Sequence, residues 1–157
     1  MESVFRGQDH YSLAQYDLGV AYYNGQGVLQ DYIEAVKWYK LAAAQGFANA
    51  QSDLGDMYYN GQGVLQNYPE SAKWYKLAAA QGIARAQNNL GLGHATGQGV
   101  AQNYLLAYMW WNLAAVRGNK DSINNRDLVA AKMTPQQIAE AQRLARECQA
   151  RNFKSCD

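Results

Sequence analysis

The chain has 157 residues, of which 48% are apolar, with 14 Lys plus Arg against 13 Asp plus Glu. This length suits one domain, and the composition excludes an intrinsically disordered chain and a strongly basic nucleic-acid-binding protein. Because the basic and acidic residues are nearly balanced, we expect no nucleic-acid partner. No apolar stretch approaches the roughly 20 residues needed to cross a bilayer, so we expect no membrane insertion.

Fourteen glycines and two prolines stand in a chain otherwise rich in helix-forming residues. Glycine inside a helix costs about 1 kcal/mol relative to alanine, so the glycines need a positional reason. A shift of 36 residues supplies it: residues 50–85 match 14–49 at 27 of 36 positions, and 86–121 match 50–85 at 16 of 36. Twelve glycines fall in four columns of this repeat. A period of this length predicts a stacked array of one structural unit.

Each copy is expected to form two antiparallel helices, preceded by an incomplete leading helix near residues 3–12. In the first helix of the first copy, Ala14, Leu18 and Tyr22 share one face, and Gly19 allows a neighbouring helix to approach closely. The NGQGV segment that follows has paired glycines, which predict a tight connection with positive φ angles.

The second helix of each copy has start and stop signals. Asp31 and Asn67 are N-cap candidates, each followed three residues later by a glutamate, which is the spacing of a capping box. The apolar stripe of the first copy consists of Ala35, Trp38, Tyr39 and Ala42. Gly46 lies where a left-handed residue closes the helix. One helical hairpin cannot bury such a stripe alone, but stacked hairpins can.

The pattern A-x-x-x-L-G-x-x-Y-x-x-G-x-G-V, followed by W-Y-x-x-A-A-x-x-G, resembles the Sel1-like repeat (SLR) family, which is related to tetratricopeptide repeats. The resemblance covers residues 14–121. It implies an all-α fold, a right-handed α-solenoid of helix-turn-helix repeats, whose first helices line a concave surface that binds proteins. The third copy departs from the pattern, because His94 stands in the column of Tyr22 and Tyr58.

After Gly118 we expect the register to break, with residues 119–132 forming an insertion before a new helix. Thr134 as N-cap, Pro135 at the first helical position and Gln137 as a capping-box partner mark the start of that helix. Its apolar stripe predicts a capping helix that docks on the third copy. We therefore expect one repeat domain over 1–157, with repeats 14–49, 50–85 and 86–121 and a capping segment 122–157.

The two cysteines, Cys148 and Cys156, are eight residues apart, as are Ala42 and Ala50 in the repeat, with Asn152 in the place of Gly46. In cysteine-rich secreted members of the SLR family, disulfides bridge positions of this kind, so the resemblance implies a Cys148–Cys156 bond. The alternative is two unrelated thiols. A disulfide implies a periplasmic or secreted protein whose leader is absent from this chain, and the alternative is a cytoplasmic protein.

The motifs of enzymes and cofactor-binding proteins are missing from the sequence. GQGV follows a predicted helix and lacks the Lys-Ser/Thr of a phosphate-binding loop, so it is interpreted as a turn. His10 and His94 have no further ligand residues at metal-binding spacing, and no nucleophile stands in a recognisable catalytic motif. We expect no cofactor, no metal and no enzymatic activity.

Columns that vary between near-identical copies are the candidates for partner contact. The predicted groove is aromatic and mildly acidic, since the first helices carry aspartates and no Lys or Arg, and it suits an extended peptide with basic or amide groups. The expected contact residues are Tyr16, Asp17, Val20, Tyr23, Asn24, Asp53, Asp56, Tyr59, Asn60 and Asn88. The alternative interpretation of these residues is a solvated helix face.

The leading functional hypothesis is a non-catalytic adaptor that binds a protein or peptide, with a monomer as the expected state. Two alternatives remain. One is binding or hydrolysis of a cell-wall or β-lactam-related small molecule, as suggested by cysteine-rich relatives, and the other is a structural scaffold in an envelope assembly.

Overall fold

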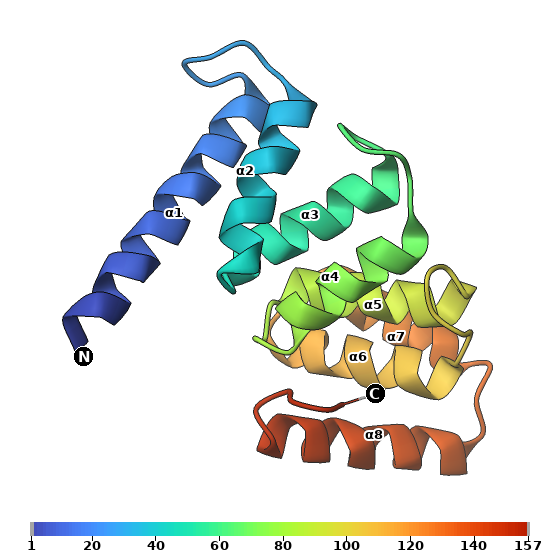
Figure 1. Ribbon diagram of the computed structural model, residues 1–157. Coiled ribbons are helices and arrows are strands. Elements are labelled where there is room, and N and C mark those ends of the chain that lie inside the picture. The colour runs from blue at the N-terminus through green and yellow to red at the C-terminus, as the bar shows by residue number, and fades with distance from the viewer. Residues whose placement is uncertain (1, 157) are drawn as a thin grey trace. The chain divides into compact units, whose positions relative to one another are not determined.

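The structure is a computed structural model that describes the backbone of residues 2–156 and the side chains of residues 11–156. Over this range the chain forms eight helices and no strand (Figure 1). The helices are α1 (Glu2–Asn24), α2 (Tyr32–Ala44), α3 (Ala48–Asn60), α4 (Tyr68–Ala79), α5 (Ala84–Thr96), α6 (Tyr104–Val116), α7 (Lys120–Ala130) and α8 (Pro135–Ala150). The chain divides into two compact units, Met1–Asn67 (unit 1) and Tyr68–Asp157 (unit 2).

Consecutive helices pack against each other within each unit. In unit 1, α1 packs against α2, and α2 packs against α3. In unit 2, α5 contacts α4 and α6, and α6 contacts both α7 and α8 (Figure 1). The all-α, helix-turn-helix repeat fold is therefore confirmed. That residues 1–157 form a single repeat domain stays a prediction.

Residues 3–12, expected to form an incomplete leading helix, are helical, but they are not an element apart from the first repeat. Helix α1 runs from Glu2 to Asn24 without a break, so the leading segment and the first helix of the first repeat are one helix. No proline or paired glycine lies within α1, and its two isolated glycines, Gly7 and Gly19, are insufficient to end a helix.

The register break expected after Gly118 is also wrong. Helix α7 begins at Lys120, which is 36 residues after the start of α5 at Ala84, so it takes the place of the first helix of a fourth repeat. Asn119 caps it, since its side chain accepts a hydrogen bond from the Ser122 amide at 2.9 Å. The 36-residue period ends after α7, because the connection from α7 to α8, residues 131–134, is shorter than the connection from α5 to α6, residues 97–103.

The predicted N-cap at Asp31 is confirmed: its Oδ1 accepts from the amides of Ile33 at 2.9 Å and Glu34 at 3.1 Å. The capping box at this position does not form, because the Glu34 side chain pairs with Lys37 and the Asp31 amide donates to the carbonyl of Tyr22. The capping box at the start of α8 is present.

Gly19 performs the predicted role of allowing close helix packing. A Cβ atom there would lie 2.4 Å from Cδ1 of Tyr39, whose ring is buried between α1 and α2. Gly91 has the same relation to Trp111, at 2.7 Å from Nε1. Any larger residue would push the paired helices apart.

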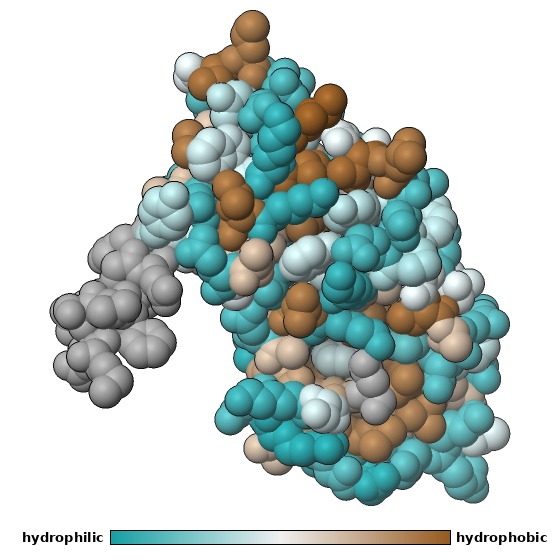
Figure 2. Space-filling view, viewed as in Figure 1, coloured by the Kyte–Doolittle hydropathy of each residue, from teal (hydrophilic) through white to brown (hydrophobic). Residues whose placement is uncertain are grey.

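The apolar stripe of the first helices is buried in two repeats and exposed in the first. Leu54 of α3 and Leu90 of α5 are at most 1% exposed, whereas Leu18 of α1 is 41% exposed. Apolar side chains also reach the surface in the connections, where Leu29 and Leu65 are about nine-tenths exposed. Figure 2 shows such apolar atoms over the α1–α2 connection. Within the described part of the chain, no helix is long and apolar enough to span a membrane.

Candidate functional site

Nine of the ten residues expected to contact a partner belong to helices α1 and α3 of unit 1. We refer to eight of these nine, all except Tyr16, as the α1–α3 surface. Its exposed members are Asp17, Asn24 and Asn60, and its half-buried members are Val20, Tyr23, Asp53, Asp56 and Tyr59.

Tyr23 is held in place by contacts with the start of α2 and with the turn that follows α3. Its ring centroid lies 5.2 Å from that of Tyr32 at the start of α2, in a tilted arrangement. Its hydroxyl donates to Oε1 of Gln62, just after α3, at 3.5 Å. The side chain thus spans from α1 to the second repeat, with its conformation already restricted.

Tyr16 differs from the expectation of a free groove residue. Its ring lies 5.0 Å from that of Phe47 and 5.7 Å from that of Tyr39, centroid to centroid. Tyr39 is only 2% exposed, so Tyr16 covers the core of its own repeat. We therefore remove Tyr16 from the candidate surface.

Asn88 is likewise a packing residue. Its Oδ1 accepts hydrogen bonds from Ser122 Oγ at 2.8 Å and from Asn125 Nδ2 at 3.4 Å, and its carbonyl accepts one from Trp111 Nε1 at 3.0 Å. Asn88 thus joins α5 to α7 and α6. We remove it from the candidate surface for this reason.

Tyr16, Ser52 and Asn88 occupy one column of the repeat, and Ser52 is fully buried. The column varies because each repeat offers it a different neighbour: the Tyr39 and Phe47 rings in the first copy, and a buried serine of α7 in the third. Variation between copies therefore reports a change of packing partner here, not exposure. The signal for Ser122 in the sequence is its place 36 residues after Ala86, in the same column of the repeat, and the interpretation of residues 119–132 as an insertion missed it.

The charge of unit 1 is separated between its helices. The described side chains of α1 and those of α3 include aspartates and no Lys or Arg, whereas Lys37 and Lys40 lie exposed on α2. Lys40 Nζ also lies 5.5 Å from the centroid of the Tyr58 ring. The α1–α3 surface is thus mildly acidic, and its hydrogen-bonding groups are carboxylates, amides and phenols.

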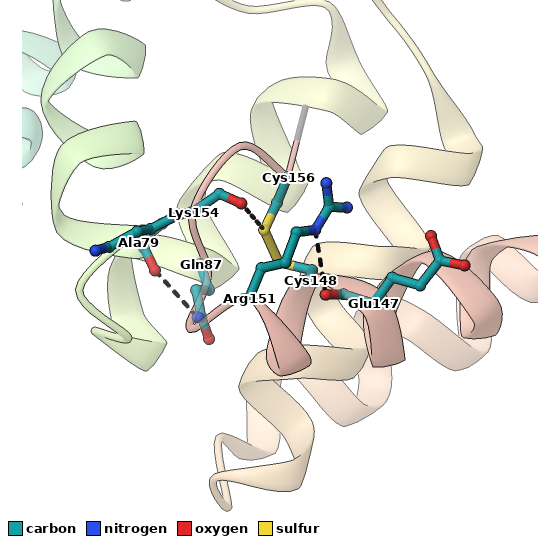
Figure 3. Close-up of a disulfide and its surroundings, with 7 residues drawn as sticks. All are labelled: Ala79, Gln87, Glu147, Cys148, Arg151, Lys154 and Cys156. Carbon is teal, nitrogen blue, oxygen red and sulfur yellow. Dashed lines mark hydrogen bonds between the residues drawn. A yellow bond between two sulfur atoms is a disulfide. The ribbon is translucent and has the colours of Figure 1, made fainter.

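Cys148 and Cys156 form a disulfide, as the family resemblance implies (Figure 3). Cys148 is fully buried near the end of α8, in the same core cluster as Trp110 and Leu113 of α6. Asn152 has a φ of 52°, as expected for a residue in the place of Gly46. The disulfide ties the last described segment of the chain to α8.

Arg117 also holds the end of the chain. Its guanidinium lies 4.8 Å from the centroid of the Phe153 ring and donates from Nη1 to the carbonyl of Gly82 at 2.7 Å. One side chain after α6 therefore contacts both the α4–α5 connection and the segment within the disulfide loop.

The described residues contain no group of three or more His, Cys, Asp or Glu side chains that could hold a metal ion. His94 is 5% exposed, and its Nδ1 lies 3.2 Å from the carbonyl oxygen of Ala101, so it fills its column as a packed residue. The side chain of His10 lies outside the described residues.

Comparison with known proteins gives one family and several related structures. The model of the Sel1 repeat matches residues 12–47, 48–83 and 84–119, with the expected period and boundaries two residues earlier than expected. No curated protein gives a significant match. The chain is similar to c5321, described as a protective antigen present in uropathogenic Escherichia coli strains and displaying an SLR fold, with 46% identity and a TM-score of 0.71 over 73% of this chain. This chain spans about a quarter (24%) of the length of c5321.

Two further structures are similar to this chain. A Sel1 repeat protein from Oxalobacter formigenes is 35% identical, with a TM-score of 0.70, over 80% of this chain and 96% of its own. Cysteine-rich protein B of Helicobacter pylori is 20% identical, with a TM-score of 0.62, over 76% of this chain and 92% of its own, and this similarity concerns the fold alone. By three consecutive repeat matches and by these structures, the chain belongs to the Sel1 repeat family.

Proposed function

We propose that this protein is a non-catalytic adaptor whose α1–α3 surface binds an extended segment of a protein partner. Sel1 repeat proteins are protein-interaction modules, and the family is typically a non-catalytic scaffold. The observation that carries the proposal for this surface is the restricted Tyr23 ring on a surface of exposed and half-buried carboxylates and exposed amides, without Lys or Arg on α1 from residue 11 onward or on α3. Tyrosines of this kind give contact area at low entropic cost.

The chemistry of the surface selects the partner. Asp17, Asp53 and Asp56 attract basic groups, and the amides of Asn24 and Asn60 suit hydrogen bonds with peptide backbone. A surface without Lys or Arg lacks the means to bind phosphate backbones. The partner is thus an extended peptide segment with Lys or Arg side chains.

The test begins with selection of binders to the full chain from a phage-displayed random peptide library. A selected peptide is then synthesised, and its affinity is measured by calorimetry for wild type and for Y23A/Y59A. Hot-spot tyrosines cost about 2 kcal/mol or more when truncated, so we expect at least about a tenfold loss. The matched control is K37A, which changes an exposed residue of α2 and should leave the affinity unchanged.

Two further measurements make the result specific. Circular dichroism melting of Y23A/Y59A checks that the fold is intact, and D17N/D53N/D56N should weaken binding mainly at low salt. If selected peptides bind Y23A/Y59A as tightly as wild type, the proposed surface is wrong.

We also propose that the protein works outside the cytoplasm, in the periplasm or secreted. The Cys148–Cys156 disulfide supports this location, because such bonds persist in oxidising compartments. Alkylation of intact cells, followed by mass measurement of the protein with and without reductant, tests it. Two thiols that react before reduction would contradict it.

A further inference from the structure

Unit 2 contains an open pocket of about 220 Å³ among α5, α6 and the end of α7, which we call the Ala95 pocket. The residues of its lining that carry the argument are Ala95, Tyr104, Trp111, Leu128, Val129 and Lys132. For scale, a cavity of about 150 Å³ lined by apolar side chains is enough to bind benzene.

The repeat explains why this pocket exists. Tyr23, Tyr59 and Ala95 occupy one column, and Tyr32, Tyr68 and Tyr104 occupy another. In the first copy the Tyr23 ring packs on Tyr32 and reaches the following repeat. The third copy keeps the partner ring at Tyr104 but replaces the stacking tyrosine by Ala95. The pocket beside Tyr104 therefore occupies the place that a tyrosine ring fills in the first repeat.

The walls of the pocket favour an aromatic group. Trp111 is 4% exposed, and its indole N–H already donates to the carbonyl of Asn88, so it offers ring carbon to a ligand. Leu128 is 70% exposed and Val129 is 4% exposed, so the apolar lining runs from the core to the surface. A ring inserted here would contact Tyr104 and Trp111 in the tilted or offset arrangements that aromatic pairs prefer.

The mouth of the pocket carries a positive charge. Lys132 Nζ lies 5.5 Å from the centroid of the Tyr104 ring, and within the described residues no carboxylate pairs with it. A lysine beside an aromatic pocket favours a ligand that has a carboxylate next to its ring.

We propose that the Ala95 pocket binds an aromatic side chain of a peptide partner and that Lys132 pairs with a carboxylate adjacent to that side chain. This proposal rests on the proposed function, in that the partner is a peptide. It adds a second anchor, in unit 2, with a chemistry opposite to that of the acidic α1–α3 surface.

The test uses 3-(4-hydroxyphenyl)propionate and its neutral amide as probes of the full chain, followed by NMR. The expected result is saturable shifts of the Trp111 indole N–H and of the Leu128 and Val129 methyl groups. A dissociation constant of the order of 1 mM is expected for a ligand of this size. The A95Y variant restores the tyrosine of the repeat and should weaken binding at least about tenfold. A44Y, which adds a tyrosine at an exposed alanine of α2, is the matched control and should bind as wild type does.

The carboxylate is tested separately. Wild type should bind the acid several-fold more tightly than the amide, and K132Q should bind both equally. Absence of saturable shifts at these residues, or equal binding by A95Y and wild type, would overturn the pocket, and an unchanged preference in K132Q would overturn the role of Lys132.

The library peptides selected on the full chain distinguish this inference from the proposed function. Selected peptides with an aromatic residue beside Asp or Glu should lose affinity for A95Y. If selected peptides depend on Tyr23 and Tyr59 but not on Ala95, the pocket inference fails and the proposed function stands. If the probes bind but no library peptide binds, the proposed function fails. The proposal that a peptide side chain occupies the Ala95 pocket then fails as well.

Discussion

Gly63 lies against the backbone of Tyr32, so that a Cβ atom on Gly63 would come within 2.2 Å of the Tyr32 carbonyl oxygen. Gly99 has the same relation to Tyr68, also at 2.2 Å, whereas a Cβ at Gly27 would meet nothing within 4 Å. The second glycine of the turn therefore has two roles. It adopts a positive φ in every copy, and in the second and third copies it also allows the turn to touch the second helix of the preceding repeat.

The pair G27A and G63A separates these two roles. Both residues have positive φ, 74° and 69°, so both substitutions should cost about 1–2 kcal/mol for the left-handed conformation. G63A adds a steric overlap with Tyr32, which raises its cost by about 1–3 kcal/mol. Urea unfolding followed by circular dichroism measures the difference. Equal losses for the two variants would contradict the contact.

Asn88 is expected to affect stability and not partner binding. N88A leaves the buried Ser122 hydroxyl without this acceptor, which should lower the free energy of unfolding by about 1–3 kcal/mol. The double variant N88A/S122A should recover most of that loss, because Ala50 and Ala86 fill the same column as Ser122. A double-mutant cycle measures the coupling. A loss of peptide affinity at unchanged stability would return Asn88 to the candidate surface.

The disulfide is expected to contribute roughly 2–3 kcal/mol, from the chain-entropy model for a loop this short. Dithiothreitol should then lower the Tm of wild type by roughly 5–10 °C. The control is C148A/C156A, whose Tm should not respond to the reductant. Alanine is the suitable replacement at Cys148, because Ala42, Ala78 and Ala114 are fully buried at corresponding positions. An unchanged Tm of wild type after complete reduction would refute the stabilising role.

Arg143 on the exposed face of α8 donates hydrogen bonds to Glu140 and also pairs with Glu147. The hydrogen bonding from Arg143 is the main cause that lowers the pKa of the Glu140 carboxyl. R143Q should raise that pKa toward the ordinary value of about 4.3, as followed by NMR titration of the side-chain carboxyl. R146Q, one turn further along α8, is the control.

The sign of the linked effect on stability follows from the lowered pKa. The ion pair contributes above the unfolded-state pKa, and this contribution is lost as the pH falls through the lower folded-state value. The pair is exposed, so the effect on acid unfolding should be small. A wild-type Glu140 that titrates as it does in R143Q would contradict the interaction.

Local sequence signals determined much of this fold. The 36-residue period, the turn glycines, the Asp31 cap and the capping box of α8 act over a few residues each, so they can be read without knowledge of distant contacts. The role of Gly19 could also be predicted, because a glycine that recurs inside the first helix of every copy, at a cost of about 1 kcal/mol relative to alanine, indicates a packing reason. The pairing of Cys148 with Cys156 followed from the family resemblance.

Which of the predicted contact residues are available to a partner depended on contacts between segments far apart in the chain. The sequence identified Tyr23 as variable and aromatic, but only the tertiary structure placed its hydroxyl against Gln62. The same criterion selected Tyr16 and Asn88, which the structure shows to be packed.

The sequence by itself thus determined the repeat, its helices and its turns, because these depend on backbone preferences and on periodic apolar stripes. Only the tertiary structure decided that α7 continues the array and that Asn88 accepts a hydrogen bond from Ser122 of α7. It also decided that the change from tyrosine to Ala95 leaves a pocket beside Tyr104. The physical reason is that burial of a side chain depends on what packs against it. In a stacked array the residue that packs against a side chain can belong to the next repeat. A single substitution in one repeat can therefore change the environment of a side chain in the preceding repeat.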